Sequence, residues 1–73
     1  MVQRSAHFIK HDGKTGEILS QHDCILTRSE IIEALQEFWP RVRIETTYGV
    51  TSAEVFENDA DITPAYVFEI TNA

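Results

Sequence analysis

The sequence predicts a small α+β domain in which one antiparallel β-sheet carries a single α-helix on one face. One amphipathic segment starts at a capping motif around Thr27 and stops before Pro40. On either side of it lie short runs of alternating apolar and polar residues, the pattern of half-buried strands. The predicted order is therefore two strands, a helix and three strands (ββαβββ), with the helix packed on one face of the sheet.

The length is that of a single domain, which we assign to residues 1–73. No repeat, linker or low-complexity tract divides the chain. A core of this size supplies only about 3 to 5 kcal/mol, and small domains often gain stability by pairing with a second copy. A sheet with one helix also leaves its other face uncovered. We therefore expect a homodimer or another protein partner.

The first two strands are predicted to form a hairpin, with strands at residues 4–11 and 17–26 and a turn at residues 12–17. Two sets of apolar residues compete for its inner face, and the pattern does not choose between them: Ile9, Ile18 and Cys24, or Phe8, Leu19 and Ile25.

The helix is predicted to begin at a capping box, in which Thr27 and Glu30 bond to each other's backbone amides. Pro40 ends it after about twelve residues, because proline cannot continue the hydrogen-bond ladder. The apolar face of the helix is predicted to consist of Ile31, Ile32, Leu35, Phe38 and Trp39.

The remaining strands are predicted at residues 42–48, 50–56 and 66–70, with a turn at Gly49 and an acidic loop at residues 57–64. A meander, in which each strand lies beside its neighbour in the chain, is the simplest arrangement. The aromatic side chains fit inward or edge positions, so the core is expected to hold Phe38, Trp39, Tyr48, Phe56, Tyr66 and Phe68.

The formal net charge of −6 arises from the C-terminal part of the chain, because residues 44–73 contain six acidic residues and no lysine or arginine. Such a segment repels phosphate backbones, which argues against direct nucleic-acid binding. It favours a basic protein partner. The candidate partner-binding residues are Glu45, Glu54, Glu57, Asp59, Asp61 and Glu69.

The cellular compartment is predicted from one cysteine and from the N-terminal residues. Cys24 is the only cysteine, so no disulfide forms within the chain, and a reducing cytoplasm is expected. No apolar run resembles a signal peptide or reaches the roughly 18 residues of a membrane span. We therefore expect a cytoplasmic protein that does not associate with membranes.

The histidines give the only candidate for a chemical site. A regular hairpin register that pairs Asp12 with Glu17 places His7 opposite His22 and brings Cys24 to the same face. These three side chains are weak candidates for metal ligands, because their spacing matches no zinc motif. A cysteine nucleophile lacks an orienting third group. We expect no metal, no cofactor and no catalytic residues.

Two further motifs are incomplete. Gly13-Lys14-Thr15 resembles the end of a phosphate-binding loop, but Phe8 occupies the position of its first glycine. The alternating acids of residues 57–61 resemble half of a calcium loop that lacks its glycine and its final glutamate. A turn and a solvated loop explain these segments better.

The function expected from these observations is that of a small, acidic, cytoplasmic protein-binding or regulatory domain rather than an enzyme, of the kind that phages and mobile elements encode. One alternative is a DNA mimic, whose spaced carboxylates replace phosphates and inhibit a nucleic-acid-handling protein. A second alternative is a homodimer that binds a small ligand or metal through His7, His22 and Cys24.

Overall fold

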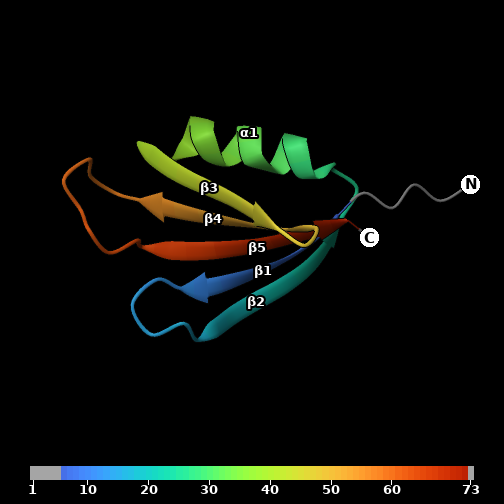
Figure 1. The fold of residues 1–73 in the computed structure, drawn as a ribbon, viewed down its shortest axis with the longest axis horizontal. Coiled ribbons are helices and arrows are strands. Elements are labelled where there is room, and N and C mark those ends of the chain that lie inside the picture. The colour runs from blue at the N-terminus through green and yellow to red at the C-terminus, as the bar shows by residue number, and fades with distance from the viewer. Residues whose placement is uncertain (1–5, 73) are drawn as a thin grey trace, which may run out of the picture.

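The computed structural model describes residues 6–72 and confirms the α+β fold with the element order ββαβββ (Figure 1). Five strands form one antiparallel sheet, and one helix lies on it. The elements are β1 (Ala6–Asp12), β2 (Ile18–Cys24), α1 (Arg28–Phe38), β3 (Arg41–Thr47), β4 (Val50–Phe56) and β5 (Tyr66–Asn72).

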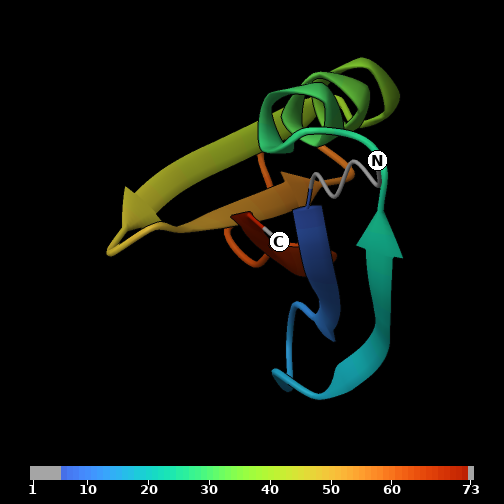
Figure 2. The ribbon, with the colours of Figure 1, turned by 90° about the vertical axis from the view of Figure 1, so that its right-hand side faces the viewer.

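The strand order is β2-β1-β5-β4-β3, so only the last three strands form the predicted meander. The meander prediction is wrong for the first hairpin, because β1 pairs with β5 from the far end of the chain. The segment containing α1 carries the chain from the β2 edge to the β3 edge, across one face of the sheet (Figures 1 and 2). As a result, β2 and β3 are the two outer strands.

The helix begins and ends as the sequence predicts. The Thr27 hydroxyl accepts a hydrogen bond from the Glu30 amide (3.2 Å), and the Glu30 carboxylate accepts one from the Thr27 amide (2.9 Å). These bonds satisfy two of the amides that the first turn of a helix leaves without partners. They also hold the pKa of Glu30 below its ordinary value, mainly through the Thr27 backbone amide.

The core lies between α1 and the central strands. Ile70 and Val55 are fully buried on neighbouring strands, and Ile31 is the buried residue of the helix. Phe8 and Cys24 are partly buried against this cluster. The inner face of the first hairpin therefore combines one member of each alternative set, and neither set forms this face as a whole.

Two aromatic residues predicted to be in the core lie at the surface. Phe38 is 79% exposed at the end of α1, and Tyr48 is 100% exposed. Tyr48 and Gly49 form the two-residue turn between β3 and β4, with φ angles of 52° and 78°. Positive φ at both positions is the geometry of a type I′ turn, which matches the twist of the two strands it joins.

The face of the sheet opposite α1 is here called the open face. It is mostly polar, with His7, His11, Ser52, Glu54 and Glu69 among its half-buried residues. Antiparallel sheets tolerate such a solvated face. Its composition therefore does not require a covering partner. No helix within residues 6–72 is long and apolar enough to cross a membrane.

Candidate functional site

A β-bulge in the first hairpin separates the predicted histidine and cysteine ligands. The Asp12 amide donates to the Glu17 carbonyl at 2.8 Å, as the predicted register requires. Beyond it, however, His11 pairs with Ile18 and Lys10 pairs with Ser20, which leaves Leu19 as an extra residue in β2. One extra residue in a strand shifts the pairing of all later residues by one position, which moves their side chains to the other face of the sheet.

The register prediction is therefore wrong for His7 and His22. His7 lies opposite Asp23, with its Nδ1 atom 2.9 Å from the Asp23 carboxylate, on the open face. His22 lies opposite Phe8 on the helix face, and their ring centroids are 5.3 Å apart. The same regular register would pair Cys24 with Ser5, which lies outside the described residues, whereas the structure pairs Cys24 with Ala6.

Cys24 packs against the hydrophobic core. It is half-buried against the core, and its Sγ atom accepts a hydrogen bond from the Leu26 amide at 3.4 Å. His7 is on the other side of the sheet, so the three candidate ligands do not converge. Within residues 6–72, no group of three or more histidine, cysteine, aspartate or glutamate side chains is placed to hold a metal ion.

His11 forms a polar contact that the sequence analysis missed. Its Nδ1 atom lies 3.1 Å from the Gly16 carbonyl oxygen, and its Nε2 atom lies 2.6 Å from Glu69 Oε1. The second contact has the distance of an ion pair but not the direction of a hydrogen bond. The β1–β5 pairing creates this contact, so the sequence offered no local signal for it.

The six candidate partner-binding acids separate into two groups. One group lies on three different strands of the open face and consists of Glu45, Glu54 and Glu69. Two of these have basic neighbours, because Glu69 contacts His11 and the Glu54 carboxylate is 3.7 Å from Arg43 Nε. The other group lies in the segment between β4 and β5, residues 57–65, which we call the acidic loop.

The acidic loop is held in place through its backbone. Arg41 donates to the Asp59 carbonyl and, at 2.7 Å, to the Asp61 carbonyl, while its guanidinium lies 3.9 Å from the centre of the Phe56 ring. Arginine suits this position because its planar fork reaches two acceptors at once. Since the carbonyls take these bonds, the Asp59 and Asp61 carboxylates are not engaged by Arg41.

The turn between β1 and β2 supports the other side of the acidic loop. The Gly13 amide donates to the Ala65 carbonyl at 3.1 Å. Asp12 shapes this turn by accepting from the amides of Lys14 (2.8 Å) and Thr15 (3.0 Å), and these bonds hold the pKa of Asp12 below its ordinary value.

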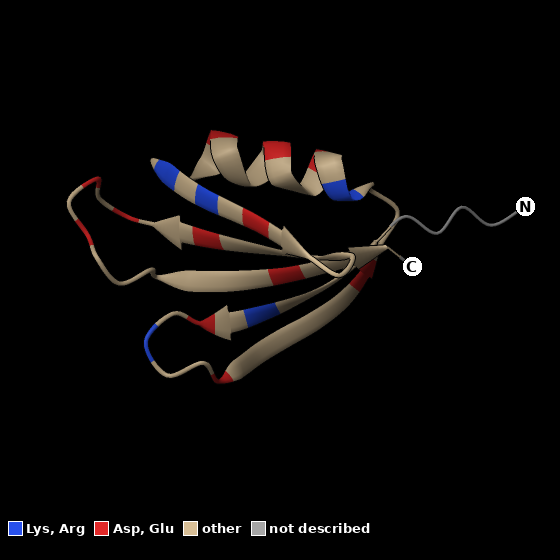
Figure 3. Ribbon diagram, viewed as in Figure 1, with Lys and Arg blue, Asp and Glu red and all other residues tan. Residues whose placement is uncertain are grey.

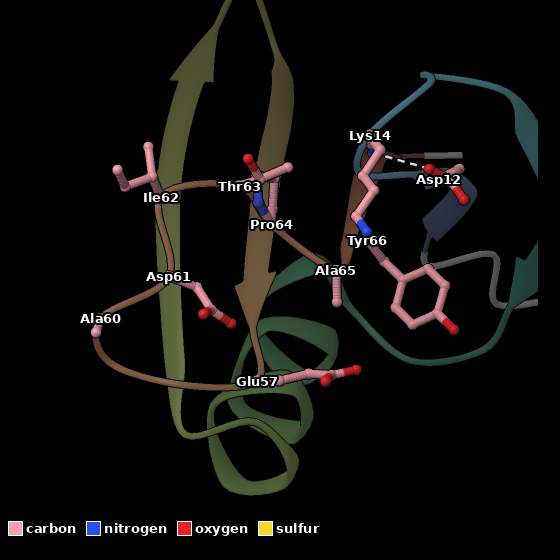
Figure 4. A pocket seen from close by; sticks show the side chains of 10 residues that line it. All are labelled: Asp12, Lys14, Glu57, Ala60, Asp61, Ile62, Thr63, Pro64, Ala65 and Tyr66. Atoms are coloured by element: carbon pink, nitrogen blue, oxygen red, sulfur yellow. Dashed lines mark hydrogen bonds between the residues drawn. The ribbon is translucent and has the colours of Figure 1, made fainter.

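An open hollow of about 600 Å³ lies between the acidic loop and this turn (Figure 4). The carboxylates of Glu57 and Asp61 line it on one side, and Asp12 and Lys14 line it on the other. A second hollow of about 600 Å³ lies between the same loop and the start of β3. The loop is thus accessible from two sides at one end of the molecule.

Comparison with protein-family models, with curated proteins and with solved structures found no match for this chain.

Proposed function

We propose that this protein is a small cytoplasmic protein-binding domain whose acidic loop docks onto a basic segment of a partner protein. The observation that carries the proposal is the backbone clamp on the loop. Arg41 and Gly13 bind carbonyl groups on the two sides of the loop, so neither takes up the carboxylates of the loop. The Glu57 and Asp59 side chains are exposed, and the Asp61 carboxylate accepts only a long bond from Asn58 Nδ2, at 3.4 Å. A loop fixed before binding loses less conformational entropy when it docks.

The charge distribution supports the same proposal. Acidic residues occur in the loop and within β4 and β5, whereas the two arginines at the start of β3 lie near the loop (Figure 3). Arg41 is already engaged by loop carbonyls. Complementary charge accelerates encounter and selects partners of opposite sign, so the partner surface should be rich in lysine or arginine.

The test compares two triple variants with the same net charge. One is Glu57→Gln/Asp59→Asn/Asp61→Asn, which removes the loop charges and leaves the backbone clamp intact. The control is Glu17→Gln/Glu33→Gln/Glu37→Gln, which removes three exposed charges from the hairpin turn and the helix. Each tagged protein is used to capture partners from a lysate of its source and is washed through a salt gradient.

We expect a basic protein to be retained by the parent and by the control but lost from the loop variant, with release at moderate salt. Equal losses from both variants would mean that net charge alone matters and would contradict the proposal. Circular dichroism melting curves of all three proteins establish that the difference does not come from unfolding.

A further inference from the structure

The outer edge of β3 is a second surface available for binding. β3 is the last strand in the sheet order, so within residues 6–72 its outer edge pairs with no strand. All seven of its residues pair with β4 without a register shift, and residues 43–47 are exposed. The other outer strand, β2, is interrupted by the bulge at Leu19. Bulges hinder edge pairing, so β3 is the better edge for adding a strand.

The turn between β3 and β4 determines which backbone groups point outward. Thr47 and Val50 flank the two-residue type I′ turn, so they form a hydrogen-bonded pair. Hydrogen-bonded and non-hydrogen-bonded pairs alternate along an antiparallel ladder. The amide and carbonyl groups of Val42, Ile44 and Thr46 therefore face away from β4.

We propose that two copies of this chain pair antiparallel through β3, with Ile44 opposite Ile44 on the two-fold axis. In this register the three outward-facing residues of each copy meet those of the other and form about six backbone hydrogen bonds. Arg43 of each copy lies opposite Glu45 of the other. These two residues form non-hydrogen-bonded pairs, in which side chains approach most closely.

The charges on β3 select this register among the neighbouring ones. Centring the pair on Arg43 or on Glu45 brings two identical charges together. Centring it on Val42 places Arg41 opposite Arg43, and centring it on Thr46 leaves the charged residues opposite uncharged ones. Only the Ile44-centred register gives two opposite-charge pairs and no like-charge pair. The order of basic and acidic residues along β3 is visible in Figure 3.

Self-pairing requires no property of the acidic loop, so it is independent of the function proposed above. The helices of the two copies lie on the same face of the resulting continuous sheet, because the two-fold axis is perpendicular to it. The side chain of Ile44, which is 37% exposed in the single chain, is covered by its counterpart on that face.

The test uses charge reversal and sedimentation equilibrium of the full chain from micromolar to near-millimolar concentration in low salt. We expect the parent to dimerise, and Arg43→Glu and Glu45→Arg each to weaken the dimer by at least about tenfold because each creates two like-charge contacts. An equimolar mixture of the two variants restores opposite charges across the axis, so it should dimerise again. The double variant R43E/E45R should dimerise as the parent does.

A parent that stays monomeric over this range would overturn the proposal. A dimer that neither charge reversal weakens would place the interface elsewhere and would overturn it too. Arg43 is 71% exposed at its side chain, but its reversal also places a glutamate opposite Glu54 within the chain. Melting curves therefore establish that each variant is folded before its dimer is compared with that of the parent. An additional variant, Ile44→Pro, removes an outward amide at an edge position, where proline is tolerated, and should abolish pairing.

Discussion

Gly13 lets the turn between β1 and β2 lie directly against the acidic loop. A Cβ atom at this position would overlap the Pro64 carbonyl oxygen, so no residue with a side chain fits there without moving the loop. Arg41 secures the opposite side of the loop through two carbonyls. Two residues outside the loop thus fix its position through backbone carbonyl groups, and neither of them takes up the carboxylates of the loop.

The turn that contains Asp12 should weaken in acid. The pKa of Asp12 is lowered in the folded chain by the amides of Lys14 and Thr15. As pH falls through the carboxyl range, the unfolded chain therefore binds more protons at Asp12 than the folded chain does. The stabilisation of the folded chain by the Asp12 carboxylate is present at neutral pH and is lost as the pH falls below the pKa of Asp12 in the folded chain. We expect the difference in unfolding free energy between the parent and Asp12→Asn to shrink from pH 7 to about pH 3.

Urea unfolding at several pH values measures this difference. The Asp12→Asn variant keeps an oxygen acceptor for the two amides and removes only the titrating group. The matched control Lys14→Ala keeps the Asp12 carboxylate and the backbone amide of residue 14 and removes only the Lys14 charge, the smallest contribution to the lowered pKa of Asp12. It should therefore follow the parent's acid dependence closely. A difference in unfolding free energy between the parent and Asp12→Asn that stays constant at all pH values would show that Asp12 does not cause the acid sensitivity of the turn.

Among the elements, the turn between β3 and β4 carries conformational strain. Tyr48 has a positive φ of 52°, which is unfavourable for a residue with a Cβ atom, and its fully exposed side chain gains no packing in return. Asparagine tolerates this conformation far better than tyrosine. We expect Tyr48→Asn to raise the free energy of unfolding by about 1 kcal/mol, as measured by urea titration.

Tyr48→Val provides the comparison for this turn, because a β-branched side chain is still less tolerant of positive φ. It should lower the stability below that of the parent. If the asparagine and valine variants are equally stable, backbone strain at this position is not significant.

The elements also show which features of the fold sequence patterns predict. The capping box at Thr27, the stop at Pro40 and the turn at Gly49 depend on residues close together in the chain, and each is confirmed. The bulge at Leu19 was missed, because Ile18 and Leu19 are both apolar and alternation cannot tell which one is extra. The prediction that His7, His22 and Cys24 share one face is wrong because of this bulge.

The candidate site was predicted only in part. The acidic character of residues 57–61 follows from the sequence, whereas the clamp on the loop depends on Arg41, some twenty residues earlier, and on the first hairpin turn. Contacts between segments so far apart leave no periodic signal. The pairing of β1 with β5, which brings His11 to Glu69, was unpredictable for the same reason.

For the whole molecule, stability depends on a few buried residues of β5. Ile70 is fully buried and lies between Phe8 of β1 and Thr51 of β4. Replacing such a residue with alanine costs about 3 kcal/mol, which is most of the stability expected of so small a core. We expect Ile70→Ala to be largely unfolded near physiological temperature by circular dichroism.

Ile62→Ala is the matched control, because Ile62 is 94% exposed in the acidic loop. It should unfold at the same temperature as the parent. A cooperative transition of Ile70→Ala close to that of the parent would show that the core does not depend on the central position of β5.

The pairing of β1 with β5 also bears on how the chain folds during synthesis. β1 emerges from the ribosome early, but the neighbour on one of its two sides is the last strand of the sheet to be made. Until residues 66–72 emerge, β1 has a partner only in β2, and the nascent chain exposes an unpaired strand edge. Long-range pairing of this kind closes slowly, so one edge of β1 stays unpaired until β5 docks, and unpaired strand edges are sites at which chains aggregate.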